Sequence, residues 1–544
     1  MDQHTNNPHE HDELTLFAFL TELNTQTQAL THEDLVVRLV KYAETIPAEQ
    51  RTAMLRHFTA TAALPEEPQP YTPDPSLQGD IECFGADLRS QSFVESWDWD
   101  MRTDNEMIVT GDTSWATDMA DLFARTDAAF LGEDFAVAAA AYAILLSLFT
   151  LQEELCEGVF PGEDDPVSMV GINVEETVAR YLRSLLASDD AQRAKTFVAQ
   201  FAEMSQQFYQ QISLKAILEA SPQPLADTDQ WLGAVEPLFA ARAQETADFS
   251  RPDWAKLLRE AILLRSGVDG LGDFARERGA DQPEAYYEWV LALRNEGRHD
   301  EALHAAQDAV ATVQLPQAKA VLANALGRMF DARGAHEDAW CAKALAWQCY
   351  PSLYNLTVLL SHGQADVSAM LVRLDAEYAR YQRGELDFSH IDYAAPSMRI
   401  LFLALAGDLD RIATEAHMAT GVGWSEFGHI GYSACAVLLL ALLDPPALPP
   451  AGSVLATYAL AIEQRAISHG LCTLIPTPNE EHAVDYLGLL LTRLTQHPVD
   501  GGRRATYRDI AKQLMLRRVE GIVGGQHRSA YDRAAQIAVA YAEA

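Results

Sequence analysis

The chain has 544 residues, 48% of them hydrophobic and 22% charged, with a formal net charge of −38. This length predicts several domains or an extended repeat array, and the apolar content excludes an intrinsically disordered protein. So strong a negative charge argues against general nucleic-acid binding, because an acidic surface repels phosphates. Alanine and leucine dominate and long alternating Val, Ile and Thr runs are missing, which predicts an all-α fold.

The charge is unevenly distributed. Residues 80–176 carry 22 Asp and Glu against three Arg and no Lys, whereas residues 501–544 carry eight Lys and Arg against four acids. The acidic stretch is either solvated surface or a surface that steers a basic partner, or the basic C-terminal end itself, within a Debye length of about 8 Å.

The six cysteines, at positions 83, 156, 341, 349, 435 and 472, form no CxxC pair, so we expect reduced thiols in a cytoplasmic, bacterial-type protein. Cys341 and Cys349 are expected to be buried against a neighbouring repeat. The first thirty residues lack the apolar core of a signal peptide. The longest apolar runs, residues 135–151 and 434–443, are shorter than the roughly 18 to 20 residues of a membrane span, so we expect no membrane partner.

The N-terminal part is predicted to be a small helical unit followed by a linker. Helical periodicity marks residues 14–30, 33–44 and 48–62, so residues 1–63 form the unit. Prolines at 65, 68, 70, 73 and 75 exclude a helix and predict an extended linker over residues 64–79.

Residues 80–280 are predicted to form an acidic helical domain. Residues 83–112 are its least helical part, where Trp97 and Trp99 either anchor a long loop or stack on a ligand. A loop over residues 158–172 carries three consecutive acids, which form a solvated turn or hold a divalent cation or basic peptide. These acids are Glu163, Asp164 and Asp165. Helices are predicted in residues 118–130, 135–151, 174–186, 191–213, 226–244 and 254–266.

Residues 286–351 contain two copies of the same glycine-to-alanine spacing. Gly297 precedes Ala302 by five residues and Ala309 by twelve, and Gly334 stands in the same relation to Ala339 and Ala346. This resembles the tetratricopeptide-type repeat, with glycine in a tight turn and alanines where two helices approach closely. The resemblance implies an α-solenoid body over residues 281–445, with degenerate copies at 352–363, 367–381 and 398–410, and a groove that binds a protein or peptide.

A second resemblance covers scattered segments of about residues 115–190 and 280–544. The strings that begin at Gly132, Val174 and His527 are similar to the helical region of bacterial SWIM zinc-finger proteins. The CxC and CxH zinc motif of that family is absent, so the resemblance implies a helical scaffold and neither a metal nor a cofactor.

No motif predicts catalysis. Ser389, His390 and Asp392 are neighbours in sequence, whereas catalytic triads draw their members from distant positions. The glycine-rich residues 421–431 lack the Lys-Ser/Thr of a phosphate loop. We therefore expect no catalytic, cofactor-binding or metal-binding residues.

The C-terminal residues 446–544 are predicted to be a helical cap with a basic face, with helices at 454–468, 480–494, 507–520 and 530–541. The basic face either contacts an acidic protein surface, balances the charge of helix ends, or contacts nucleic acid.

The sequence thus predicts a non-enzymatic helical-repeat scaffold or adaptor that binds a protein partner through its groove and acidic surface. Alternatives are a regulatory or inhibitory subunit of a bacterial enzyme or defence complex, switched by proteolysis at the linker, and nucleic-acid contact through the basic end. The candidate partner-binding residues are Trp97, Trp99, Glu163, Asp164, Asp165, Arg517, Arg518 and Arg528.

Overall fold

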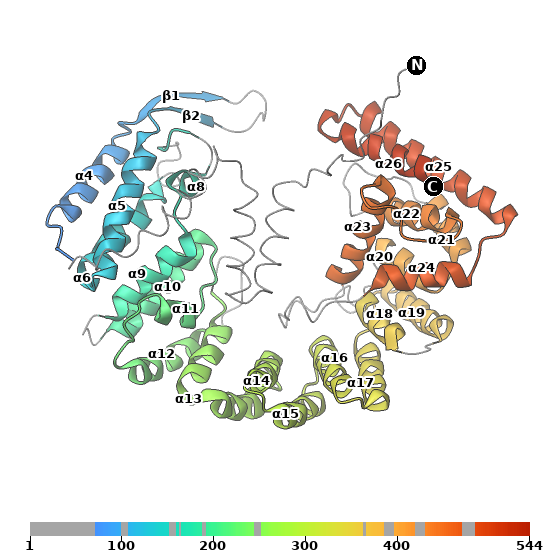
Figure 1. Ribbon diagram of the computed structural model, residues 1–544, viewed down its shortest axis with the longest axis horizontal. Helices are drawn as coiled ribbons and strands as arrows, with labels where there is room; N and C mark the ends of the chain where they lie inside the picture. The colour runs from blue at the N-terminus through green and yellow to red at the C-terminus, as the bar shows by residue number, and fades with distance from the viewer. Residues whose placement is uncertain are drawn as a thin grey trace, which may run out of the picture. The chain divides into compact units, whose positions relative to one another are not determined.

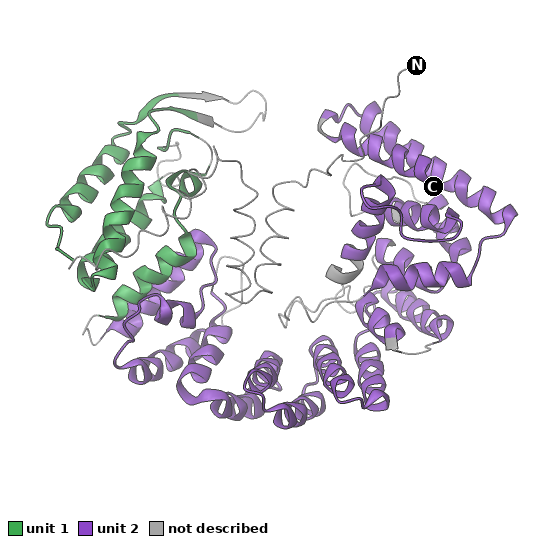
Figure 2. Ribbon diagram, viewed as in Figure 1, with its two compact units in different colours: residues 1–189 green, residues 190–544 purple. Residues whose placement is uncertain are grey.

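The computed structural model describes residues 71–99, 107–151, 159–162, 165–187, 192–243, 252–362, 366–385, 396–418, 430–469 and 485–544. The chain divides into two compact units, residues 1–189 and residues 190–544 (Figure 2). The predicted N-terminal unit, residues 1–63, lies outside the described residues, as do residues 64–70 of the predicted linker.

Among the residues of the first unit that the structure describes, the regular elements are helices and one hairpin (Figure 1). Helices α4, α5, α6 and α9 pack on one another, and the short α8 contacts α5. Its elements are α4 (Leu77–Arg89), β1 (Val94–Trp99), β2 (Met107–Gly111), α5 (Ser114–Leu131), α6 (Phe135–Leu148), α8 (Pro166–Val170) and α9 (Val174–Leu186).

The stretch 83–112, predicted to be the least helical part of its domain, holds the two strands that the structure describes, but it is not a loop throughout. Its first residues belong to α4, which begins at Leu77 and so also shortens the predicted linker. The helix forms because Leu77, Ile81, Phe84 and Leu88 recur at spacings of four, three and four and are all buried. Strands β1 and β2 then pair in antiparallel register.

The predicted turn between α5 and α6 is confirmed, and Tyr71 packs against it. Asp134 caps α6 by accepting a hydrogen bond from the Val137 backbone N–H at 3.4 Å. A Cβ atom at Gly132 would lie 2.1 Å from Cγ of Tyr71. Only glycine therefore lets the Tyr71 ring, near the end of the proline-rich segment, pack on this turn.

In the second unit every regular element that the structure describes is helical, which confirms the all-α class for most of the chain (Figure 1). Helices that follow one another in the chain are in contact from α12 to α18. The elements are α10 (Arg193–Phe208), α11 (Leu214–Glu219), α12 (Thr228–Arg242), α13 (Trp254–Arg278), α14 (Pro283–Asn295), α15 (His299–Thr312), α16 (Pro316–Ala332), α17 (His336–Cys349), α18 (Leu353–His362), α19 (Val367–Gln382), α20 (Pro396–Leu405), α21 (Leu409–Met418), α22 (Ile430–Leu442), α23 (Val454–His469), α24 (Tyr486–Gln496), α25 (Gly501–Val519), the π-helical η4 (Glu520–Gly524), the 3₁₀-helical η5 (Arg528–Ala530) and α26 (Tyr531–Glu543).

The repeated spacing of residues 286–351 falls on α14 to α17 as predicted. Gly297 and Gly334 occupy the two turns with φ of 75° and 72°, a left-handed conformation that favours glycine. The four alanines of the pattern are at most 1% exposed. They are Ala302, Ala309, Ala339 and Ala346. Small side chains therefore lie where α14 meets α15 and where α16 meets α17.

The C-terminal helices share one hydrophobic core. Helix α22, expected from the apolar run at 434–443, is buried from Tyr432 to Leu442. The Tyr486 hydroxyl donates to the Leu401 carbonyl at 3.0 Å and so joins α24 to α20. Glycine-rich residues 421–429 and the Ser389, His390 and Asp392 string lie outside the described residues.

The prediction for the cysteines of α17 is wrong for Cys341, which is exposed, whereas Cys349 is partly buried. The two residues are eight apart and do not share one helix face closely enough for both to reach the neighbouring helix. None of the described helices combines the length and apolar content that a bilayer span requires.

Candidate functional site: an acidic cavity beside α13 and α14

The second unit contains a cavity of ≈ 630 Å³ beside the first turns of α13 and along α14. Five carboxylates and two cationic side chains line it, which leaves a formal charge of −3. The carboxylates are Asp253, Glu260, Asp281, Glu284 and Glu288, and the cations are Lys256 and Arg259. We refer to this space as the acidic cavity.

Helical periodicity brings these side chains to the cavity. On α13 the lining residues Lys256, Arg259, Glu260 and Leu263 follow the spacing of a single helix face. The lining residues of α14 begin at Glu284 and follow the same spacing to Asn295. The start of each helix is fixed locally, because Asp253 accepts a bond from the Lys256 N–H at 2.9 Å and Pro283 stands in the first turn of α14.

Arg259 joins the two helices across the cavity wall. Its side chain is 3% exposed, and its Nε and Nη2 donate to the two carboxylate oxygens of Glu288 at 2.9 Å each. Burial opposes the charge of this guanidinium, but the bonds to Glu288 outweigh that effect and raise the pKa of Arg259. This bidentate pair fixes the position of Glu288.

Other carboxylates of the acidic cavity have acceptor capacity that no described donor uses. Glu260 accepts the Lys215 N–H at 2.9 Å through one oxygen, while its Oε2 is buried without a described donor. The Oε1 atom of Gln282 is likewise buried without a described donor. Burial raises the pKa of Glu284, although Arg259 opposes this shift. The wall therefore favours a ligand that brings hydrogen-bond donors and positive charge.

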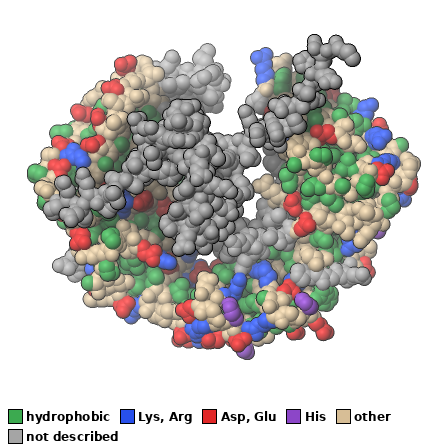
Figure 3. Space-filling view, in the orientation of Figure 1, with side chains coloured by type: hydrophobic (Ala, Val, Ile, Leu, Met, Phe, Trp, Pro, Cys, Tyr) green, Lys and Arg blue, Asp and Glu red, His purple; other side chains and the backbone are tan. Residues whose placement is uncertain are grey.

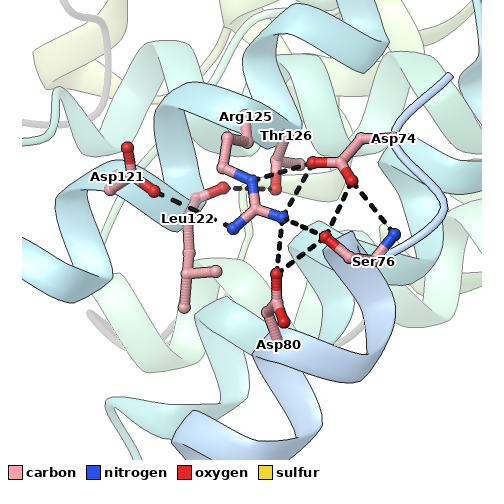
Figure 4. Close-up of polar contacts among 7 residues, drawn as sticks. All are labelled: Asp74, Ser76, Asp80, Asp121, Leu122, Arg125 and Thr126. Carbon is pink, nitrogen blue, oxygen red and sulfur yellow. Dashed lines mark hydrogen bonds and ion pairs between the residues drawn. The ribbon is translucent and has the colours of Figure 1, made fainter.

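A second polar network lies in the first unit, where Arg125 of α5 holds the start of α4 (Figure 4). Its Nη2 lies 2.7 Å from carboxylate oxygens of Asp74 and Asp80 and donates to the Ser76 hydroxyl at 3.0 Å. Hydrogen bonds from Arg125 lower the pKa of both carboxyl groups. We call Arg125, Asp74, Ser76 and Asp80 the Arg125 latch, because they attach the end of the proline-rich segment and the start of α4 to α5.

Another polar network in the first unit joins α5, α6 and α9. The Tyr142 hydroxyl of α6 donates to Asp127 of α5, and Arg180 Nη1 of α9 lies 2.9 Å from the other oxygen of Asp127. Tyr142 is fully buried, and burial raises its pKa above the ordinary value. This network ties three helices together.

The predicted partner-binding residues of the first unit do not form one described site. Trp97 and Trp99 lie on β1, paired with Val109 and Met107. Glu163 and Asp164 lie outside the described residues. Asp165 caps α8 by accepting bonds from the backbone N–H groups of Val167 and Ser168 at 3.1 and 3.3 Å. Asp165 therefore serves as the N-cap of α8.

The predicted basic face of the C-terminal helices is only partly present. Arg517 and Arg528 are exposed, but Arg518 is 1% exposed, so its assignment to a surface site is wrong. Its guanidinium lies over the Tyr432 ring, 5.6 Å from the centroid. Consecutive residues of a helix point about 100° apart, so Arg517 can face solvent while Arg518 lies on the side of α25 that is buried.

Sequence reasoning missed the acidic cavity. The pattern that would have indicated it is the run of charged residues at one-face spacing on two successive helices, from Lys256 and from Glu284. No protein-family model, curated protein or solved structure matches the chain in comparisons with known proteins. The described residues define an all-α protein with an acidic cavity, and they hold no cluster of His, Cys, Asp and Glu placed to bind a metal.

Proposed function

We propose that the chain is a non-enzymatic helical-repeat scaffold that binds a protein partner through a basic segment of that partner. The acidic cavity carries the proposal, because it combines an excess of carboxylates with buried acceptors that lack described donors. A Lys or Arg side chain supplies positive charge and several N–H donors on a long stem that reaches into a cavity.

The proposal includes a tetratricopeptide-like arrangement of α14 to α17. It is supported by the glycines with positive φ in equivalent turns and by the buried alanines at equivalent positions. Helix α14 contacts both α15 and α16, as expected when helical hairpins stack. Stacked hairpins bind extended peptides along one face, and the acidic cavity includes one side of α14.

Binding, rather than catalysis, is supported by the way the carboxylates are held. Glu288 is fixed by Arg259, and Glu260 accepts a backbone N–H of α11. Such groups are positioned to receive a cation, and the raised pKa of Glu284 falls when a cation approaches. The acidic cavity would therefore select its partner by the positive charge and the hydrogen-bond donor geometry of that partner.

A fluorescein-labelled hexalysine peptide tests the proposal by fluorescence anisotropy at low and high salt. We expect saturable binding to the full chain that weakens as NaCl rises from 50 to 300 mM, as a charge-dominated contact of partly exposed groups requires. Glu284→Gln should weaken binding about tenfold, the effect of losing one charge-assisted contact.

The matched control is Asp308→Asn, which removes one negative charge from an exposed position of α15 outside the cavity lining. Equal weakening by Asp308→Asn and Glu284→Gln would mean that the peptide senses only net charge, and would contradict the site. Salt-insensitive binding would contradict the electrostatic part. Proteins that co-purify from the native host then identify the natural partner.

One observation favours the regulatory alternative. The end of the proline-rich segment is held at two places, by Tyr71 on the Gly132 turn and by the Arg125 latch. A segment anchored at its end transmits cleavage or tension to α5 and α6. Limited proteolysis of the full chain, followed by binding of the labelled peptide, distinguishes the two functions, because a simple scaffold keeps its affinity after cleavage within residues 64–70.

A further inference from the structure

A second cavity of the same unit has the opposite charge. It measures ≈ 390 Å³ and lies at the end of α14, the start of α15 and the end of α16. Its lining consists of Arg294, His299, Arg328, Met329, Ala332 and Arg333. Three of these six residues are arginines, a fourth is histidine and none is acidic, in a chain whose net charge is −38.

The turn at Gly297 brings these residues together. Its positive φ lets the chain reverse between Arg294 of α14 and His299 of α15. Arg333 reaches across from the end of α16, donating to the His299 carbonyl at 2.8 Å and lying 2.7 Å from Asp300. Arg328 lies five residues earlier and is partly buried. The cavity is thus built from three successive helices.

Charge balance at helix ends explains only part of this arrangement. Arginines near a helix C-terminus interact favourably with its dipole, and this accounts for Arg294 and Arg333. Arg328 stands more than a turn from the end of α16, where the dipole effect has faded, so the helix end does not explain its place in the lining. An anion in the cavity would accept charge-assisted hydrogen bonds from these guanidinium groups.

Along the lower edge of the view in Figure 3, over α14 to α17, Lys, Arg and His atoms are interspersed with Asp and Glu atoms. Asp300, outside the lining, already pairs with Arg333. An entering anion therefore shares guanidinium groups that have other contacts, which predicts modest affinity and a preference for a doubly charged group.

We propose that this cavity binds the phosphate group of a small phosphorylated molecule. Guanidinium forks match phosphate oxygens in pairs, and a dianion fits three cationic groups better than a single carboxylate does. The cavity is larger than a phosphate ion needs, and Met329 and Ala332 form an apolar wall for an organic body. A polynucleotide is disfavoured, because its further phosphates would meet a strongly acidic protein.

The test is a ³¹P NMR titration of the full chain with inorganic phosphate and with phenyl phosphate at pH 7.5. We expect saturable binding of both, weakened by NaCl, with phenyl phosphate the tighter ligand. Arg328→Gln should lower both affinities about tenfold, as the loss of a charge-assisted hydrogen-bond donor predicts.

Arg265→Gln is the control, because Arg265 pairs with Glu236 at 3.1 Å and does not line the cavity. Where Arg328→Gln does not fold, by circular dichroism, the exposed Arg294→Gln replaces it. Absence of saturable binding, or equal weakening by Arg265→Gln, overturns the site. Tighter binding of a twelve-nucleotide single strand than of phenyl phosphate, lost in the same variant, overturns its assignment to a small molecule.

Discussion

At the scale of single residues, two buried arginines of the second unit differ in their partners. Arg259 and Arg518 are each at most 3% exposed, but Arg259 forms a bidentate pair with Glu288. The Nε and Nη1 of Arg518 have no acceptor in the described part of the chain, and its guanidinium instead lies over Tyr432. Burying a charged group without hydrogen bonds is costly, so the two positions should respond differently to an apolar substitution.

We expect Arg518→Met to leave the free energy of unfolding unchanged or to raise it, because methionine keeps the stem and removes the orphaned N–H groups. Arg259→Met should lower it by about 1–3 kcal/mol, since it leaves Glu288 without its donor. Thermal and urea denaturation of both variants measures this difference. Equal destabilisation would mean that the Arg518 guanidinium has a stabilising role that the cation–π contact does not explain.

The raised pKa of Glu284 predicts that both stability and hexalysine binding depend on pH. Its pKa is raised above the ordinary value of 4.5, so the folded state binds more protons than the unfolded state just above that pH. Stability therefore falls as pH rises from 4.5 through the folded pKa, whereas affinity for hexalysine rises over the same range as the carboxylate forms. Glu284→Gln should remove both trends. Urea midpoints and peptide anisotropy measured from pH 4 to 8 test this, and unchanged trends in the variant would assign them to another group.

At the scale of elements, the Arg125 latch explains how residues 71–80 are held on α5. Arg125→Gln should increase hydrogen exchange in residues 71–80 and expose them to proteases, with little effect on the melting temperature, because exposed ion pairs contribute little to stability. The lowered pKa values of Asp74 and Asp80 mean that the latch persists above the ordinary value of 3.8 and weakens as pH falls below it.

Hydrogen exchange measured by mass spectrometry at pH 7 tests the latch. Arg276→Gln is a suitable control, since Arg276 also makes an exposed pair, with Asp273 at 2.7 Å in α13 of the other unit. If both variants leave exchange in residues 71–80 unchanged, the Tyr71 contact with the Gly132 turn holds the segment without Arg125.

An element could be predicted from the sequence when the residues that define it lie within it or directly beside it. Residues 174–186 were predicted to be a helix, and α9 has these bounds because Asn173 caps it and its buried residues recur along one face. The start of α4 was missed because the prolines before it dominated the pattern. At Gly267 the prediction of a helix end was partly right: φ is 67°, but a second helical stretch continues to Arg278.

The acidic cavity could not be predicted from the sequence, because it is formed by residues that are far apart in the chain. Sequence spacing places Glu284 and Glu288 on one face of α14, but it does not tell which helix lies opposite. That is decided by the packing of α13 on α14 and by the Arg259 pair with Glu288, residues 29 apart in sequence. The burial of Arg518 was unpredictable for the same reason, because its alternation with Arg517 indicates two faces without indicating which one is covered.

At the scale of the whole molecule, the chain is two compact units that each have buried apolar residues of their own. Units with separate cores unfold as separate cooperative transitions when few contacts join them. The proposed ligands and the latch belong to different units, since both cavities lie within residues 190–544 and Arg125 lies within residues 1–189. This separation allows each site to be tested inside the intact chain.

We therefore expect two transitions in scanning calorimetry of the full chain. Hexalysine or phenyl phosphate at 100 times its dissociation constant adds about 2.7 kcal/mol to the unit that binds it, so one transition should move up by a few degrees while the other stays. Arg259→Met should lower that same transition, because both the acidic cavity and the Arg259 pair with Glu288 belong to the second unit. A single transition that shifts with every ligand and variant would contradict independent units, whereas a ligand that moves the other transition would place its site in residues 1–189.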